Sequence, residues 1–200
     1  MRTTVSDAAL PGVRVIDYEA FEDDRGFFYE SHSQRTFDQL GIDLRFVQDN
    51  HSRSRRGVVR GLHYQAPTSE QWRLVRCTVG QILDVVVDIE VTSPTFGQWI
   101  GVTLSAENRR QLLVPPSFAH GFAVTADVAE VQYKCTQFHD SVAERALRYD
   151  DPLLAIEWPV DAPVTSAKDA GAPTLRDYLD DPDFGPAWSN RTEPVGAVRP

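Results

Sequence analysis

The stretch Gln81-Ile-Leu-Asp-Val-Val-Val-Asp-Ile89 is apolar almost throughout, with Asp84 and Asp88 as the exceptions. A short run of this kind, rich in β-branched residues, is typical of a strand that is covered on both faces. Gly80 precedes the run and Ser93-Pro94 follows it, so each boundary carries a turn signal. The sequence therefore predicts a buried strand here.

Similar runs, rich in β-branched or aromatic residues, lie on both sides of this strand. They are Val13–Ile16, Phe27–Glu30, Leu44–Asn50, Val58–Tyr64, Arg73–Val79, Trp99–Leu104, Gln111–Val114, Gly121–Val124 and Val131–Thr136. Turn signals separate many of them at intervals of roughly 8–12 residues. Helical patterning is thin and predicts short helices at Ser33–Leu40 and Leu175–Leu179. Together these features predict an all-β sandwich or barrel with a few short helices.

The sequence shows no repeat, no low-complexity tract and no linker in its middle. We therefore expect a single domain over residues 1–200, with a β-core at about 13–160. From Ala162 onward the chain is rich in Pro, Asp and Ala, which predicts an irregular C-terminal segment, about 161–190, wrapped on this core. The last ten residues are expected to be disordered.

Composition excludes several classes of function. The 200 residues are 42% hydrophobic, which suffices to bury a core, and no run approaches the length of a membrane span. The net charge of -9 argues against a nucleic-acid-binding protein. The N-terminus lacks the apolar core of a signal peptide, so we expect a cytoplasmic protein without a membrane partner. A local basic run, His51 to Arg60, favours a small anionic ligand.

The chain has two cysteines, Cys77 and Cys135, and both lie inside apolar runs. They do not form a C-x-x-C pair, and cytosolic thiols usually stay reduced. We interpret both as small core residues.

Polar side chains embedded in strand-like sequence are informative, because burying them is costly unless they are paired or used. In Val58-Val-Arg-Gly-Leu-His-Tyr-Gln65, strand alternation places Arg60 and His63 on opposite faces unless Gly61 introduces a bulge. Taken alone, this segment favours a core histidine beside a surface arginine over a pair of functional residues. His120 is predicted to lie in a tight apolar turn, and Tyr133 ends an apolar run, where a tyrosine is most often structural.

The histidines do not have the spacing of a metal site. A metal-binding barrel usually places two histidines at i and i+2 on one strand, but position 65, two residues after His63, is Gln65. We therefore expect no metal. The sequence also lacks a G-x-G-x-x-G or Walker loop and a G-x-S-x-G nucleophile motif.

Several stretches, in colinear order from about Val13 to Asp177, together resemble the dTDP-4-dehydrorhamnose 3,5-epimerase family. They are Asp24-Arg-Gly-Phe-Phe28, Val47-Gln-Asp-Asn50, Arg60-Gly-Leu-His-Tyr-Gln65, Asp84-Val-Val-Val-Asp88, Ser93-Pro-Thr-Phe-Gly97, Ala119-His-Gly-Phe122, Tyr133-Lys-Cys-Thr136 and Ile156-Glu-Trp-Pro159. Each stretch is weak alone, but the ordered set is specific.

The resemblance implies a cupin-type jelly-roll β-barrel, a homodimer that exchanges N-terminal strands, and catalysis without metal or organic cofactor. It also implies an isomerase that converts dTDP-4-dehydro-6-deoxy-D-glucose to dTDP-4-dehydro-L-rhamnose through an enolate, with inversion at C3 and C5. In the family's mechanism, the residue matching His63 is the base and is held by an aspartate matching Asp169. The tyrosine matching Tyr133 donates a proton from the opposite face.

The resemblance also implies how the substrate is bound. Arg25, Glu30, Gln48, Asn50 and Arg60 match residues that hold the nucleotide and its diphosphate. Phe28 matches an aromatic residue that packs on the thymine, across the dimer. Asp84 and His120 match polar residues that line the sugar pocket.

The sequence departs from the family pattern near the expected site. Arg73 stands where the family usually has a lysine near the enolate oxygen, His139 where it has a tyrosine near the base and sugar, and Ser117 where it has a glycine. A single-carbon (C3 or C5) epimerase is therefore an alternative. A 3,4-ketoisomerase, a non-catalytic sugar-nucleotide-binding barrel and a metal-dependent cupin are further alternatives that fit the motifs less well.

Overall fold

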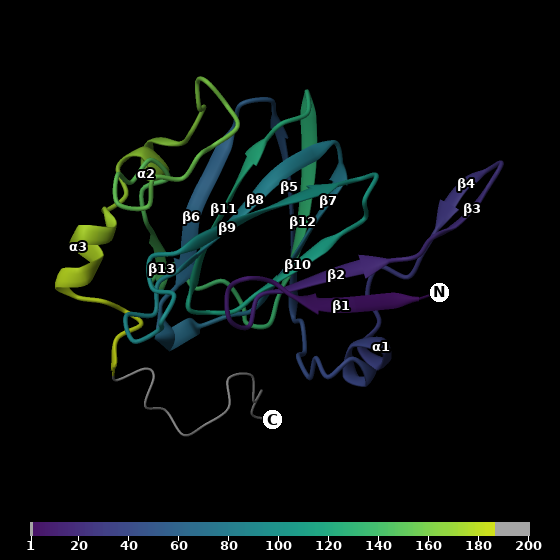
Figure 1. The fold of residues 1–200 in the computed structure, drawn as a ribbon, viewed down its shortest axis with the longest axis horizontal. Helices are drawn as coiled ribbons and strands as arrows, with labels where there is room; N and C mark the ends of the chain where they lie inside the picture. Colours follow the sequence, from purple (N-terminus) through teal and green to yellow (C-terminus); the bar gives the residue numbers. More distant parts are fainter. Residues whose placement is uncertain (1, 187–200) are drawn as a thin grey trace.

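The computed structural model describes residues 2–186 and is built mainly from two facing antiparallel β-sheets (Figure 1). The six-stranded sheet has the order β1 (Thr3–Asp7), β2 (Arg14–Tyr18), β10 (Gln111–Val114), β7 (Arg73–Val79), β12 (Val128–Cys135) and β5 (Gln48–Arg55). The five-stranded sheet has the order β13 (Glu144–Ala146), β6 (Val59–Gln65), β11 (Phe118–Val124), β8 (Gln81–Asp88) and β9 (Trp99–Ser105). The two sheets face each other as the layers of a jelly roll, which matches the predicted all-β class.

The remaining elements are small. A hairpin of β3 (Phe21–Asp23) and β4 (Gly26–Phe28) projects from the sheets beyond the end of β2 (Figure 1). The helices are α1 (Gln34–Gln39), α2 (Ala167–Ala170) and α3 (Leu175–Asp180), and a 3₁₀ turn spans Pro67–Ser69. None of the helices among residues 2–186 is long and apolar enough to cross a membrane. The predicted disorder of the last ten residues lies outside the described residues.

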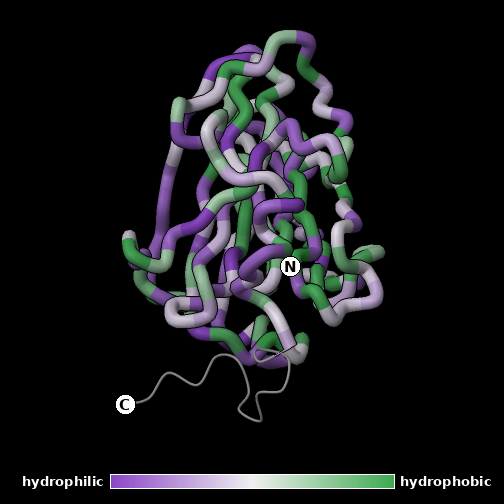
Figure 2. Tube along the Cα trace, turned by 90° about the vertical axis from the view of Figure 1, so that its left-hand side faces the viewer, coloured by the Kyte–Doolittle hydropathy of each residue, from purple (hydrophilic) through white to green (hydrophobic). Residues whose placement is uncertain are grey.

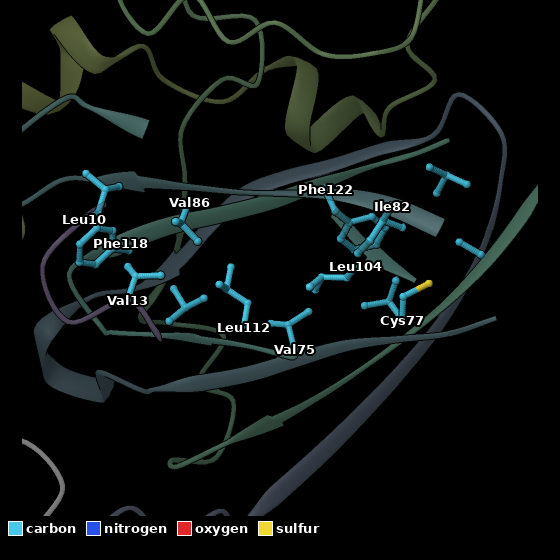
Figure 3. Close-up of a cluster of buried hydrophobic side chains, with 14 residues drawn as sticks. Leu10, Val13, Val75, Cys77, Ile82, Val86, Leu104, Leu112, Phe118 and Phe122 are labelled. Carbon is cyan, nitrogen blue, oxygen red and sulfur yellow. The ribbon is translucent and has the colours of Figure 1, made fainter. Parts of the chain in front are cut away.

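The main core lies between the two sheets. Val86 of β8 points toward Val75 of β7 and Leu112 of β10 from the opposite layer, and all three are fully buried (Figure 3). Burying an aliphatic side chain of this size contributes about 1.5–3 kcal/mol to stability. Figure 2 shows hydrophobic and hydrophilic segments alternating where the strands run through the middle of the molecule. This packing fixes the two sheets against each other, and the site described below lies between them.

The strand β8 is covered on both faces, as its almost entirely apolar sequence predicts. Ile82 and Val86 belong to the core between the sheets, whereas Val85 and Val87 belong to a second core on the outer side. That second core is completed by residues of the segment that follows β13, namely Leu147, Leu154, Leu175, Tyr178 and Phe184. The segment therefore covers the outer face of the five-stranded sheet and carries α2 to its edge.

Two local predictions are wrong. The strand predicted at Leu44–Asn50 begins only at Gln48, because Leu44 packs with Phe37 into a separate core cluster beside α1. His120 does not lie in a turn but within β11, which is buried along its whole length because it pairs with β6 on one side and β8 on the other.

Gly61 produces the bulge on which the site depends. His63 pairs with His120 and Arg60 with Phe122, so β6 uses one residue more than β11 over this interval. Gly61 adopts a φ of +121°, and a Cβ there would lie 2.6 Å from the Cα of Gly121. The bulge cancels the strand alternation, so Arg60 and His63 line the same cavity.

We expect Gly61→Ala to destabilise the fold by about 3 kcal/mol, because it adds a backbone clash to an unfavourable φ. Chemical denaturation would measure the loss. Gly26→Ala is a matched control, since Gly26 has the same φ of +121° but nothing within 4 Å of its would-be Cβ. Equal losses in the two variants would show that the close approach to Gly121 contributes nothing.

Candidate active site

A cavity of about 260 Å³ opens between β6 and β11 on one side and β5, β7 and β12 on the other. The predicted site residues that line it are Gln48, Asn50, Arg60, His63, Arg73, His120, Tyr133 and His139. Because the two sheets contribute opposite walls, groups of different chemistry face the same space from both sides.

His63 and Asp169 form a hydrogen-bonded pair at one wall of the cavity. The distance from His63 Nε2 to Asp169 Oδ1 is 2.7 Å, and the Asp169 side chain is 5% exposed. Burial alone would raise the pKa of Asp169, but the hydrogen bonds from His63, Gly61 and Ser166 lower it on balance. A carboxylate that stays charged requires Nε2 of His63 to donate, which leaves Nδ1 able to take up a proton. This is the arrangement of a positioned general base.

Ser166 and the short helix α2 place Asp169. The Ser166 side chain caps α2 by accepting a hydrogen bond of 3.0 Å from the Asp169 backbone N–H. The chain turns here beside β6. Asp169 therefore reaches the imidazole of His63, although the two residues are 106 positions apart in the sequence.

A second histidine–aspartate pair lies beside the first. His120 is the cross-strand neighbour of His63, and its Nε2 is 2.8 Å from Oδ1 of Asp84. Asp84 is fully buried and lies behind His120 rather than on the cavity wall where it was expected. In this geometry the carboxylate of Asp84 can orient His120, which lines the cavity.

Tyr133 reaches the cavity from β12, in the sheet opposite His63. Burial raises the pKa of Tyr133, while the positive charges of Arg73 and Arg60 act in the other direction. The phenol is therefore protonated at neutral pH, and its anion would have two cations nearby. These are the properties of a proton donor whose conjugate base is stabilised.

Arg73 is buried in the cavity wall next to His63. Its Nη1 donates a hydrogen bond of 2.7 Å to the backbone carbonyl of His63, and its Nε donates one of 3.4 Å to Gln71 Oε1. Burial lowers the pKa of Arg73, but a guanidinium stays charged at physiological pH. The tethered cation can stabilise negative charge in the cavity, although it is a poor acid.

Hydrogen bonds hold the polar side chains at the rim of the cavity. The Arg60 Nε donates to Ser54 Oγ at 3.0 Å, and Gln48 Nε2 donates to Asn50 Oδ1 at 3.0 Å. The backbone N–H of His139 donates to Gln48 Oε1 at 2.9 Å. These contacts hold amides, a guanidinium and an imidazole at the mouth, which suits a polar, anionic ligand.

The remaining predicted residues are not at the cavity. Arg25 and Phe28 lie on the projecting β3–β4 hairpin, where Arg25 pairs with Asp23, and Glu30 follows that hairpin (Figure 1). The basic run His51 to Arg60 does not face the cavity as a unit. Arg53 pairs with Glu130 and Arg56 with Asp127, and both pairs lie on the surface. The expected local basic patch therefore contributes only Arg60 to the cavity.

Several residues that line the cavity were not predicted from the sequence. They are Ser52, Gln65, Gln71, Gly121, Phe122 and Glu144. Gln65 stands in the motif Arg60–Gln65 and Gln71 lies just before the predicted strand Arg73–Val79, but amides have no distinctive spacing. Glu144 lies on β13, a three-residue strand that no periodicity could indicate. Among residues 2–186, no group of three His, Cys, Asp or Glu side chains is arranged to hold a metal ion.

Comparison with known proteins identifies the family. The sequence profile described as dTDP-4-dehydrorhamnose 3,5-epimerase matches residues 7–177. The chain belongs to this family. A family member from Salmonella typhimurium is 50% identical over 177 residues, covering 88% of this chain and 97% of the relative.

Solved structures of family members agree with the fold. The dTDP-6-deoxy-D-glucose-3,5-epimerase from Legionella pneumophila, in complex with dTDP-4-keto-L-rhamnose, superimposes with a TM-score of 0.84 at 45% identity, covering 88% of this chain and 94% of that one. A 3'-monoepimerase from Streptomyces bikiniensis, in complex with dTDP-quinovose, has a TM-score of 0.84 at 31% identity and covers 89% and 91%. The predicted family, its jelly-roll fold and its isomerase class are confirmed.

Proposed function

We propose that this protein is a cofactor-independent epimerase that inverts C3 and C5 of dTDP-4-dehydro-6-deoxy-D-glucose to form dTDP-4-dehydro-L-rhamnose. The observation that carries this proposal is that His63, held by Asp169, and Tyr133 come from opposite sheets and line one cavity. Inversion needs a base on one face of a carbon and an acid on the other, and this arrangement supplies both.

The chemistry follows from the positions of these groups. Nδ1 of His63 removes the proton from a carbon next to the ketone, and the C–H electron pair becomes the enolate double bond while the carbonyl oxygen gains negative charge. Arg73 and His120 line the same cavity and stabilise that oxygen. Asp169 stabilises the imidazolium that forms. Tyr133 then donates its proton to the opposite face of the carbon, and exchange with solvent restores both residues.

The nucleotide would occupy the polar rim. Arg60 presents a guanidinium that can bind a diphosphate oxygen, and Gln48 and Asn50 offer amide groups to the nucleoside. The sugar would then lie deeper, between His120, His63 and Tyr133.

Arg60→Ala should weaken binding of dTDP by about 2 kcal/mol, or about 30-fold, because it removes a charge-assisted hydrogen bond to the diphosphate. Isothermal titration with dTDP measures the effect. Arg55→Ala is a suitable control, since Arg55 is an exposed arginine of β5 that does not line the cavity. Unchanged affinity in Arg60→Ala would place the diphosphate elsewhere.

We also propose that the active form is a homodimer in which the β3–β4 hairpin reaches the partner's cavity. Phe21, Phe27 and Phe28 on this hairpin are 63%, 58% and 67% exposed, which is unusual for side chains of this size. Arg25 and Phe28 are remote from the cavity of their own chain, so a partner subunit would bring them to the nucleotide. Sedimentation analysis of Phe28→Ser against the native protein tests this arrangement.

A single-carbon epimerase is the second candidate. It is supported by His139, which replaces the tyrosine expected beside the sugar, and by the similarity to a 3'-monoepimerase. Incubation with dTDP-4-dehydro-6-deoxy-D-glucose in deuterated water distinguishes the two, with NMR locating the deuterium. Inversion at both carbons supports the first proposal, inversion at one supports the second, and no incorporation contradicts both.

A further inference from the structure

The segment that carries Asp169 has little apolar anchorage. Backbone hydrogen bonds hold its two ends, from Val59 N–H to the carbonyl of Val164 and from Arg148 N–H to the carbonyl of Pro173. Between them, only Asp169 and the small side chain of Ala172 are buried. Apolar packing therefore contributes little to the position of this carboxylate against His63, and polar contacts supply most of it.

One such contact joins the residue before Asp169 to the strand next to the base. Lys168 Nζ lies 2.6 Å from Glu144 Oε2. Glu144 is on β13, which pairs with β6 so that Glu144 is opposite Gln65 and Ala146 is opposite His63. Both ends of the His63–Asp169 hydrogen bond are thus tied to the same pair of strands: His63 through the backbone of β6, and Asp169 through Lys168 and Glu144.

The charges fit this arrangement. The hydrogen bond from Lys168 lowers the pKa of Glu144, with smaller contributions from His139 and His63 in the same direction. Glu144 is therefore ionised at neutral pH and keeps its attraction for Lys168. The Lys168 side chain is 56% exposed and that of Glu144 is 29% exposed, so the pair should contribute only about 0.2–1 kcal/mol to global stability. Its effect would be on position rather than on folding.

We propose that Glu144 and Lys168 form a positioning pair that holds α2 against β13 and thereby keeps Asp169 in hydrogen-bonding register with His63. The expected effect on kcat rests on the proposed epimerase function, whereas the expected effect on the His63–Asp169 hydrogen bond does not. Lys168 does not line the cavity, so its effect on turnover would be transmitted through Asp169.

Steady-state kinetics test the catalytic consequence. Glu144→Gln and Lys168→Met should each lower kcat about 10-fold, since small displacements of a catalytic group are costly. KM should stay within about twofold, and Lys168→Arg should retain native turnover. In a protein that already carries Asp169→Asn, neither Glu144→Gln nor Lys168→Met should lower kcat further. Asp150→Asn, which breaks the comparable surface pair Arg148–Asp150, should leave kcat unchanged.

NMR of ¹⁵N-histidine-labelled protein tests the positioning directly and needs no substrate. The ring N–H of His63 that is hydrogen-bonded to Asp169 should broaden or disappear in Glu144→Gln and in Lys168→Met. The ring N–H of His120, bonded to Asp84 in the same protein, should persist. Native kcat with an unchanged His63 signal would overturn the proposal, as would equal loss of both signals. If the native protein shows no epimerisation, the proposed function fails while the His63 signal still decides the positioning role.

Discussion

His63→Asn is expected to lower kcat at least about a hundredfold, because a positioned general base contributes about 10²–10⁴ to the rate. Asparagine is close to histidine in size and can still hydrogen-bond to Asp169, but it cannot accept a proton. The fold should be retained, since His63 lies on the cavity wall with a side chain that is 32% exposed rather than in a core cluster. Turnover and deuterium incorporation in deuterated water would both be measured, with circular dichroism to check the fold.

His51→Asn is the matched control for this experiment. His51 also lies on a strand and pairs with a carboxylate, Glu130 at 3.0 Å, but its ring is outside the cavity that contains His63. It should retain native turnover. Asp169→Asn should cause a milder loss than His63→Asn, since it disturbs the orientation of the imidazole without removing the base. A folded His63→Asn protein with near-native turnover would rule out His63 as the base.

The sequence predicts the framework well where strands are buried. The almost entirely apolar run of β8 predicts a strand covered on both faces, and the two cores on either side of it explain that pattern. Cys77 and Cys135 are buried and unpaired, as their apolar surroundings predict. The strand β1, Thr3–Asp7, escaped prediction because it is a short, largely polar edge strand.

The site was predictable only in part from the residues themselves. In the sequence, Gly61 signals where a bulge can form, and Arg60 and His63 share a face only if it does. The link from His63 to Asp169 could come only from the family resemblance, because no periodicity relates residues so far apart along the chain. Likewise, no local signal places Asp84 behind His120, since that depends on the register between β8 and β11.

Tyr133→Phe is expected to separate proton exchange from inversion. His63 and Asp169 are untouched by this change, so the base should still remove a substrate proton and return deuterium to the same face. Inverted product should largely disappear, because the phenol that faces the base from the other sheet is gone. NMR in deuterated water measures both processes in one sample, and Tyr149→Phe, which alters a tyrosine outside the cavity, serves as the control.

The same experiment reports on His139, which lies at the mouth of the cavity beside Glu144, at 3.7 Å from its carboxylate. An imidazole in place of a phenol changes the wall against which the sugar ring must turn between the two inversions. We therefore expect one of C3 and C5 to incorporate deuterium faster than the other in the native protein, and His139→Tyr to narrow the difference. Equal incorporation that His139→Tyr leaves unchanged would show that position 139 has no part in the choice of carbon. Loss of all incorporation in Tyr133→Phe would show instead that the tyrosine is needed for the first proton removal, because exchange by His63 alone requires no donor on the far face.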